Sequence, residues 1–247
     1  MSFREWNASL YDQVANPHVD WGRQVIDWLP LHGSELVMDA GCGTGRVTEL
    51  LLDKLPGGRV IAIDSSRAML REAQRRLAEQ SSRVSFVAAD LTQRLPLRLP
   101  VDAILSTAAF HWIADHDRLF ANLAAAMRPG GVLAAQCGGS GNIASVREVL
   151  KYTGDGWLGP WFFATPDETR DRLLACGFTN VRTWLAADPV RFHSSSELER
   201  FLATVILGPH LERLAPEGRG AFVEQVAARL PNRTIDYVRL NIVAMLA

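Results

Sequence analysis

Cysteine is scarce in this sequence. The three that occur, Cys42, Cys137 and Cys176, include no C-x-x-C pair, and their number is odd. A disulfide framework needs an even set at regular spacing, and a thiolate metal site needs paired cysteines. We therefore expect buried free thiols, and no metal.

An excess of charge of either sign is also absent. The 247 residues carry 26 basic and 27 acidic side chains, for a formal net charge of −1. Nucleic acid and anionic membrane surfaces favour a clustered basic excess. We therefore expect partners that are neither nucleic acid nor membrane.

Long apolar runs are missing as well. No stretch is long enough to span a bilayer, and the first residues lack the apolar segment of a signal peptide. We expect a cytoplasmic protein that is a monomer or a weak homodimer.

Short apolar runs alternate with helical patterns through about residue 190. Unbroken apolar runs of this length are typical of parallel strands covered on both faces. The predicted strands are Leu36–Ala40, Arg59–Ile63, Val84–Ala88, Val101–Ser106 and Gly131–Cys137, and the predicted helices are Val19–Leu29, Thr44–Leu55, Ser65–Glu79 and Asp117–Met127. This order predicts an α/β fold with a doubly wound sheet.

The end of the chain departs from this alternation. Phe178–Ala187 and Tyr237–Ala244 read as two more strands, and Ser194–Leu207 and Pro216–Leu230 between them read as amphipathic helices. An insertion this structured is too ordered for a loop, so we expect a small helical cap. The predicted parts are residues 1–35, helices that cover the ligand site; 36–190, the core; 191–235, the cap; and 236–247, the last core strand.

A glycine-rich segment, Asp39-Ala-Gly-Cys-Gly-Thr-Gly45, follows the first predicted strand. Glycines let the backbone approach a ligand, and the N-terminus of the next helix offers N–H donors. The dinucleotide pattern G-x-G-x-x-G requires glycine at position 46, where Arg46 stands. The loop therefore favours S-adenosylmethionine over a nicotinamide dinucleotide.

Two carboxylates support this interpretation. Asp64 closes the second strand, a position from which an acid accepts hydrogen bonds from ribose hydroxyls. Asp90 closes the third strand, where a carboxylate can accept from the adenine amino group. The alternative is that both acids are helix N-caps.

These features resemble the class I S-adenosylmethionine-dependent methyltransferases, and several motifs resemble the trans-aconitate methyltransferase family of carboxyl O-methyltransferases. The motifs run nearly end to end: Trp6-Asn7-Ala8-Ser9-Leu10-Tyr11, Ile63-Asp64-Ser65-Ser66-Arg67-Ala68-Met69, Phe110-His111-Trp112-Ile113-Ala114-Asp115-His116 and Gly131-Val132-Leu133-Ala134-Ala135-Gln136. The resemblance implies a Rossmann-like, seven-stranded, mostly parallel sheet whose last strand is antiparallel.

The resemblance also implies site residues. Tyr11 would lie over the methionine end of the cofactor, and Asp39 and Gly41 would hold its amino group. The stretch after the fourth strand, residues 107–112, would line the junction between cofactor and acceptor. The expected cofactor-binding residues are Tyr11, Asp39, Gly41, Gly43, Asp64, Ser65, Asp90, Leu91 and Thr107.

One departure from the family bears on the acceptor. The family carries a T-G-L-R-P-x-L stretch in the cap, and here Gly208 replaces its arginine. Because a tricarboxylate needs several cations, we expect a more apolar acid than aconitate. The aromatic segment 157–163 stands where a substrate wall is expected. The expected substrate-binding residues are Trp21, His111, Trp157, Trp161, Phe162 and His210.

Methyl transfer to a carboxylate is an in-line displacement that needs no general base, because the acceptor is already ionised. Alignment and exclusion of water then supply the rate. We expect His111 and Trp112 at the reacting centre, with Tyr11, Trp21 and Trp112 as aromatic partners of the sulfonium. The alternatives are a hydroxyl- or C-methyltransferase of a natural product, with His111 as base, and a cofactor-binding module without transfer.

Overall fold

The computed structural model describes residues 8, 14 and 17–247. Tyr11, a predicted cofactor contact, lies outside these residues. Within them, no helix has the length and apolar composition needed to cross a bilayer.

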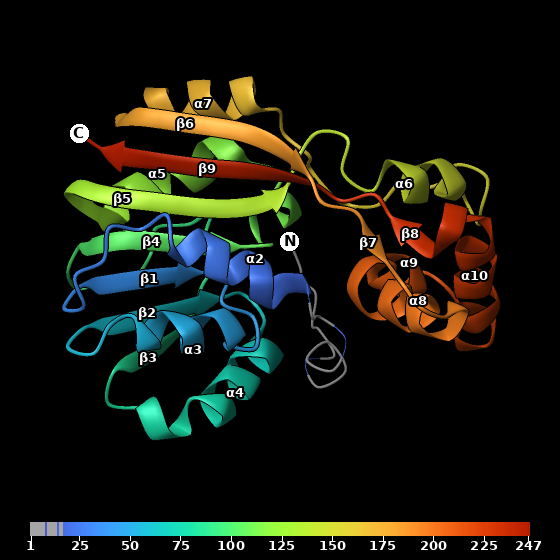
Figure 1. The fold of residues 1–247 in the computed structure, drawn as a ribbon, viewed down its shortest axis with the longest axis horizontal. Coiled ribbons are helices and arrows are strands. Elements are labelled where there is room, and N and C mark those ends of the chain that lie inside the picture. The colour runs from blue at the N-terminus through green and yellow to red at the C-terminus, as the bar shows by residue number, and fades with distance from the viewer. Residues whose placement is uncertain (1–7, 9–13, 15–16) are drawn as a thin grey trace.

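A twisted sheet forms the larger lobe (Figure 1). Its strands, in the described part of the chain, are β1 Leu36–Ala40, β2 Arg59–Asp64, β3 Val84–Ala88, β4 Val101–Thr107, β5 Met127–Gly138, β6 Phe178–Ala187 and β9 Val238–Leu246. They stand in the order β3-β2-β1-β4-β5-β9-β6, with the first five parallel and β9 antiparallel to both its neighbours. The predicted seven-stranded, mostly parallel sheet with an antiparallel last strand is confirmed.

Helices cover both faces of this sheet, which explains the unbroken apolar runs. Within β1, Val37 enters one buried cluster and Met38 the other. Residues of α2 Pro17–Ile26 and α3 Arg46–Asp53 belong to the first cluster, and α5 His116–Ala126 and α7 Pro166–Ala175 contribute to the second. The helix α4 Arg67–Arg76 packs beside β2 and β3. Short 3-10 turns occur at Ala78–Gln80, Phe110–Trp112 and Pro231–Arg233.

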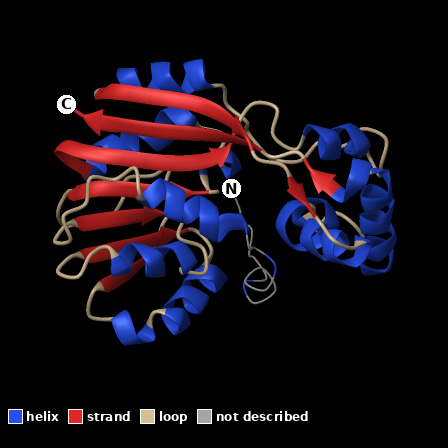
Figure 2. Ribbon diagram, in the orientation of Figure 1, coloured by secondary structure: helices blue, strands red, loops and turns tan. Residues whose placement is uncertain are grey.

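A smaller helical lobe stands beside the sheet (Figures 1 and 2). It contains α6 Ala144–Leu150, α8 Ser195–Phe201, a π-helical turn Leu202–Ile206, α9 Gly208–Leu211, α10 Pro216–Arg229 and the paired strands β7 Val190–Arg191 and β8 Thr234–Ile235. Apolar residues of α6, α8 and α10 share one buried cluster. We therefore propose that the cap comprises α6 as well as the expected residues 191–235.

Candidate cofactor and acceptor site

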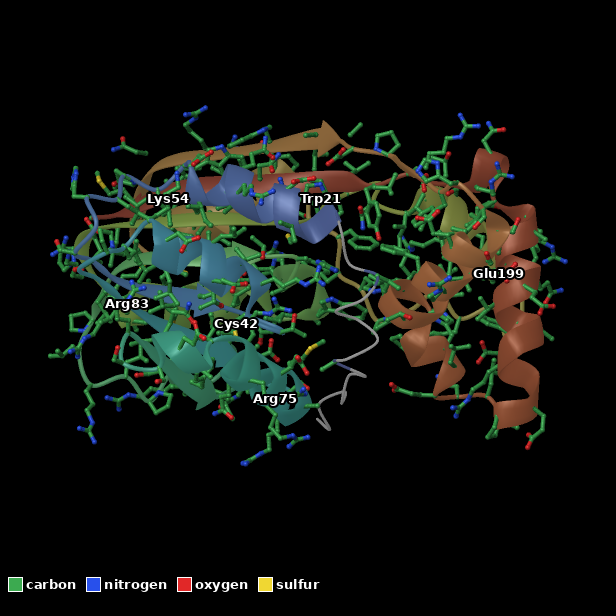
Figure 3. The ribbon with its side chains drawn as sticks, turned by 60° about the horizontal axis from the view of Figure 1, so that its bottom comes forward. Trp21, Cys42, Lys54, Arg75, Arg83 and Glu199 are labelled. Carbon is green, nitrogen blue, oxygen red and sulfur yellow. The ribbon has the colours of Figure 1, made fainter. Side chains whose placement is uncertain are left out.

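The glycine loop joins β1 to α3 at the carboxyl edge of the sheet. Gly41, Gly43 and Gly45 have φ angles of 84°, 55° and 80°, a left-handed conformation that glycine adopts without strain. The backbone N–H groups of Gly41 and Cys42 both donate to the carbonyl of Ile63, at 2.8 and 2.9 Å. These bonds fix the loop against the end of β2. Cys42, labelled in Figure 3, is itself buried.

Two of these glycines are required for different reasons. A Cβ atom on Gly41 would lie 2.3 Å from the Cβ of Ala109, so no side chain fits there. A Cβ atom on Gly43 would meet no atom within 4 Å. Gly43 therefore faces open space, which a bound molecule can approach closely.

Asp39 lies beneath the loop, fully buried. Its Oδ2 accepts a hydrogen bond from Thr48 Oγ1 at 2.6 Å, whereas its Oδ1 has no hydrogen-bond partner. Burial raises the pKa of Asp39 to about 7; the Thr48 bond opposes this rise, and the nearby Asp64 charge adds to it. A cation placed at Oδ1 would stabilise the ionised form.

Asp64 and Asp90 are held in place by local backbone bonds. Asp64 accepts from the N–H of Gly43 at 2.9 Å and from that of Ser66 at 2.8 Å. Asp90 Oδ1 accepts from the N–H and the hydroxyl of Thr92, both at 2.8 Å. Ser66, rather than Asp64, is the N-cap of α4. The helix-cap alternative therefore fails for Asp64.

A cleft of about 190 Å³ opens above these residues. Its lining includes seven of the expected cofactor residues: Gly41, Gly43, Asp64, Ser65, Asp90, Leu91 and Thr107. Met69, Ala89, Ala109 and Ile113 complete the floor, and Ala108 and Trp112 stand at one end. The structure thus brings together side chains from the ends of four successive strands.

A second, narrower cavity of about 30 Å³ adjoins the cleft, and Ala108 and Trp112 line both. Its walls come from the loop after β4, the start of α6, the aromatic segment, the π-helical turn and β9. The lining residues are Ala108, His111, Trp112, Asn142, Ile143, Trp161, Phe163, Val205, Ile206, Tyr237 and Arg239. This cavity lies between the core and the cap, and most of its lining residues are apolar.

His111 is oriented by the end of β5. Its Nδ1 accepts a hydrogen bond from the N–H of Gly138 at 3.3 Å, and its ring lies 5.4 Å from that of Trp112. A nitrogen that accepts from a backbone N–H carries no proton, so the neutral ring carries its proton on Nε2. In this tautomer the ring can donate a hydrogen bond from Nε2.

The aromatic segment alternates in direction. Trp161 and Phe163 line the narrow cavity, with ring centroids 6.1 Å apart. The Phe162 ring instead packs 4.8 Å from that of His116, toward α5 and α7. Phe163 therefore lines the cavity beside Trp161, in place of the expected Phe162.

Three other expected acceptor contacts, Trp157, His210 and Trp21, are not among the described residues that line the cavity. Trp157 and His210 stack at 4.7 Å, and His210 Nε2 bonds the Trp157 carbonyl at 2.9 Å, within the cap. Burial lowers the pKa of His210. Trp21, on the cap-facing part of α2 (Figure 3), is buried and donates from Nε1 to Asp188. The guanidinium of Arg239 lies 4.0 Å over the Trp21 ring, so that face is not available to a sulfonium.

Sequence reasoning missed Arg239 and the apolar wall of Ile143, Val205, Ile206 and Tyr237. The signal for Arg239 was present, because it is the one charged residue of β9, a strand whose other residues are apolar except for Asn241. The apolar wall carried no comparable signal, since apolar residues of helices are ordinarily core.

Comparison with known proteins agrees with this geometry. Residues 37–131 match the family model described as "Methyltransferase domain". A trans-aconitate 2-methyltransferase of Methylobacterium radiotolerans is 30% identical over 233 residues, 89% of this chain and 86% of the relative. One of Paracidovorax citrulli is 33% identical over 184 residues, 74% and 68% of the two chains. Other relatives of that name match over about half their length.

The fold is shared with solved structures at lower identity. The YcgJ protein from Bacillus subtilis superposes with a TM-score of 0.67 at 16% identity, covering 93% of this chain and 99% of that one. Fold and cleft define an S-adenosylmethionine-dependent methyltransferase, with that molecule as its cofactor. The chain belongs to the trans-aconitate methyltransferase family.

Proposed function

We propose that this enzyme methylates the carboxylate of a small, fairly apolar acid. The observation that carries the proposal is the bond from Gly138 N–H to His111 Nδ1, because it makes His111 a donor in the cavity. Methylation of a hydroxyl requires a base to remove its proton, whereas a carboxylate needs none near pH 7. Among the described lining residues, His111 is the one whose side chain ordinarily titrates near neutral pH.

The residues of the cleft suit the cofactor. Asp39 Oδ1, buried without a hydrogen-bond partner, fits an ammonium group, and open space at Gly43 admits a close ligand. We assign Asp39 and Gly41 to the amino group, Asp64 and Ser65 to the ribose, and Asp90 and Leu91 to the adenine. S-adenosylmethionine supplies the methyl group on a positively charged sulfur.

The protein's own side chains orient the acceptor, stabilise the cation and exclude water. Ala108 and Trp112 line both compartments, so we place the junction of cofactor and acceptor there. Trp112 offers a ring face worth about 0.5–2 kcal/mol to a nearby cation. His111 orients an acceptor oxygen through Nε2–H, and the aromatic walls exclude water from the nucleophile. Most of the residues that line the second cavity are apolar, which favours an acceptor with an apolar body.

Product chemistry tests the proposal. The enzyme is incubated with methyl-labelled cofactor and hexanoate, benzoate, phenylacetate, cinnamate, trans-aconitate or matching alcohols and phenols. We expect label that mild base releases as methanol, with the apolar monocarboxylates favoured over trans-aconitate. Label that survives base treatment, as in an ether or a C-methyl product, would contradict it.

The role of His111 gives a second test. His111→Gln keeps a side-chain donor and should retain most of the activity with a pH profile like that of the wild type. His111→Phe removes the donor and should raise the acceptor KM. If both variants lose activity, and if wild-type activity rises with pH as one group titrates, His111 acts as a base. That outcome would favour a hydroxyl acceptor over a carboxylate.

A further inference from the structure

The 3-10 turn Phe110–Trp112 borders both the cofactor cleft and the acceptor cavity. It sits directly against the glycine loop, because a Cβ atom on Gly41 would lie 2.3 Å from the Cβ of Ala109, the N-cap residue of the turn. His111 and Trp112 of the same turn line the acceptor cavity. A shift of this turn would therefore change both compartments at once.

The backbone that enters the turn is strained. Ala108 has a φ angle of 54°, a left-handed conformation that is unfavourable for a residue with a Cβ atom. Such a conformation persists where surrounding contacts hold it. The N–H of Ala108 donates to the carbonyl of Gln136 at 2.7 Å, which fixes the start of the turn.

His116, the first residue of α5, fixes the turn itself. Its ring is buried, and its Nε2 lies 3.1 Å from the carbonyl oxygen of Phe110. Because a carbonyl oxygen only accepts, Nε2 carries the proton of this bond. The same oxygen accepts from the N–H of Ile113 at 2.9 Å, so two donors hold it. The peptide that joins Phe110 to His111 is therefore fixed in orientation.

Packing holds the His116 ring in its place. The ring centroid lies 5.4 Å from that of Phe120 and 4.8 Å from that of Phe162, and both contacts are edge-to-face. Phe162 also donates from its backbone N–H to the carbonyl of His111 at 3.0 Å. The segment that packs on His116 is thus bonded to the same turn.

The electrostatic surroundings favour a neutral ring with a single proton. Burial lowers the pKa of His116; the bond to Phe110 opposes this change, and the charge of Arg172 on α7 adds to it. Further charged groups near the ring are Asp115 and Asp117 of α5 and Glu168 of α7. Nδ1 is buried and has no hydrogen-bond partner among the described residues, so the proton on Nε2 is the one that finds an acceptor.

We propose that His116 is a positioning residue for methyl transfer, whose bond to Phe110 holds His111 and Trp112 where cofactor and acceptor meet. Among the described residues, His116 is not part of the lining of either compartment, so it acts through the turn. The proposal rests on the junction proposed at Trp112, and it is independent of the chemical class of the acceptor.

Two substitutions separate the hydrogen bond from the packing. His116→Gln keeps an N–H donor near the position of Nε2, whereas His116→Phe keeps an aromatic ring beside Phe120 and Phe162 and loses the donor. If His116→Phe does not fold, His116→Asn takes its place, because its amide matches Nδ1 rather than Nε2. Leu123→Ala is the control for lost stability, since Leu123 is a fully buried residue of the same helix and is not among the lining residues.

The position of the turn is measured by 19F NMR. Each protein is labelled with 5-fluorotryptophan and saturated with S-adenosylhomocysteine, and the Trp112 signal is assigned with Trp112→Phe. Calorimetry gives the affinity for S-adenosylhomocysteine. The kinetic constants are measured with the compound of the panel above, acid, alcohol or phenol, that the wild type methylates fastest.

His116→Phe should move or broaden the Trp112 signal and lower kcat about tenfold or more, with the affinity for S-adenosylhomocysteine within about threefold of the wild type. His116→Gln should restore the signal and most of kcat. Leu123→Ala should lower Tm and leave the signal and kcat unchanged.

An unchanged Trp112 signal and kcat in His116→Phe overturn the proposal. A folded His116→Gln that restores neither, or a Leu123→Ala that loses kcat equally, overturns it too, because loss of stability alone would then explain the effect. If no compound of the panel is methylated, the Trp112 signal decides.

The failures of the two proposals differ in this experiment. A base-stable methyl product overturns the proposed carboxylate acceptor and leaves the role of His116 standing. A Trp112 signal that S-adenosylhomocysteine does not move in the wild type overturns the placement of the junction, and with it the role of His116.

Discussion

Asp39 offers the sharpest test of the cofactor end of the site. Its carboxyl is fully buried, one oxygen bonded to Thr48 and the other without a hydrogen-bond partner. Burial raises its pKa to about 7 from an ordinary 3.8. Because the pKa of the folded state is the higher one, the contribution of Asp39 to stability is greatest below about pH 4 and is lost as pH rises through about 7. The difference between the two pKa values of Asp39 corresponds to about 4 kcal/mol in the free energy of unfolding.

Asp39→Asn removes the charge and keeps an oxygen for the Thr48 hydroxyl. Its new amide N–H group is left without an acceptor, which costs about 1–3 kcal/mol. The balance predicts that, without cofactor at pH 8, the variant is more stable than the wild type by about 1–3 kcal/mol. At about 2–4 °C per kcal/mol for a chain of this size, Tm should rise by about 2–12 °C. At pH 4, where the wild-type carboxyl is neutral, this advantage should disappear.

Bound cofactor should oppose this difference in stability. A carboxylate that accepts from an ammonium contributes about 1.5–3 kcal/mol, so Asp39→Asn should bind S-adenosylhomocysteine about 10- to 100-fold more weakly. Thermal denaturation at pH 4 and 8, with and without S-adenosylhomocysteine, and calorimetry measure both effects. Thr48→Val is the matched control, since it removes the hydrogen bond and keeps the charge. An Asp39→Asn variant that binds S-adenosylhomocysteine like the wild type would refute the assignment.

Four other substitutions test the two compartments. Gly43→Ala should lose about 1–2 kcal/mol of stability because of its positive φ. Calorimetry should show S-adenosylhomocysteine binding at least tenfold more weakly, since the added methyl projects into the cleft. Unchanged affinity would place the cofactor elsewhere. Asp64→Ala should weaken the same binding by about 1–3 kcal/mol, and an unaltered Kd would mean that the ribose is misplaced. Trp161→Ala should raise the acceptor KM about tenfold without changing cofactor affinity. Phe162→Ala should instead lower Tm and leave the acceptor KM unchanged. The opposite pattern would mean that Phe162, and not Trp161, faces the cavity.

The central strands of the sheet could be predicted because they are buried on both faces. Val37 and Met38 point to opposite sides and both are fully buried, so no polar alternation interrupts β1. The glycine loop was equally readable, since its left-handed glycines and the crowding of Gly41 against Ala109 admit no other residue. In both cases the constraint acts within a few neighbouring residues, and the sequence displays it.

The helices α6 and α7 are not among the predicted helices, although the sequence contains a clear signal for α7. The helix α7 has a complete start signal, Thr165 and Glu168 in a capping box with proline at the first turn, so it was recognisable from the sequence. The helix α6 begins after Ile143, a non-glycine residue at φ 48° with no side-chain cap. Its position depends on contacts with the cap, which neighbouring residues do not encode. The predicted single helix Ser194–Leu207 is instead α8 followed by a π-helical turn.

The acceptor cavity is assembled by contacts between distant segments. The direction of each ring in the aromatic segment depends on packing: Phe162 finds His116, and Trp161 and Phe163 face the cavity. Trp21 has Arg239, more than two hundred positions away, over its ring. Composition alone predicted an aromatic wall. Which of its rings face the cavity depends on the alternating directions of residues 161–163, and whether Trp21 is accessible depends on Arg239.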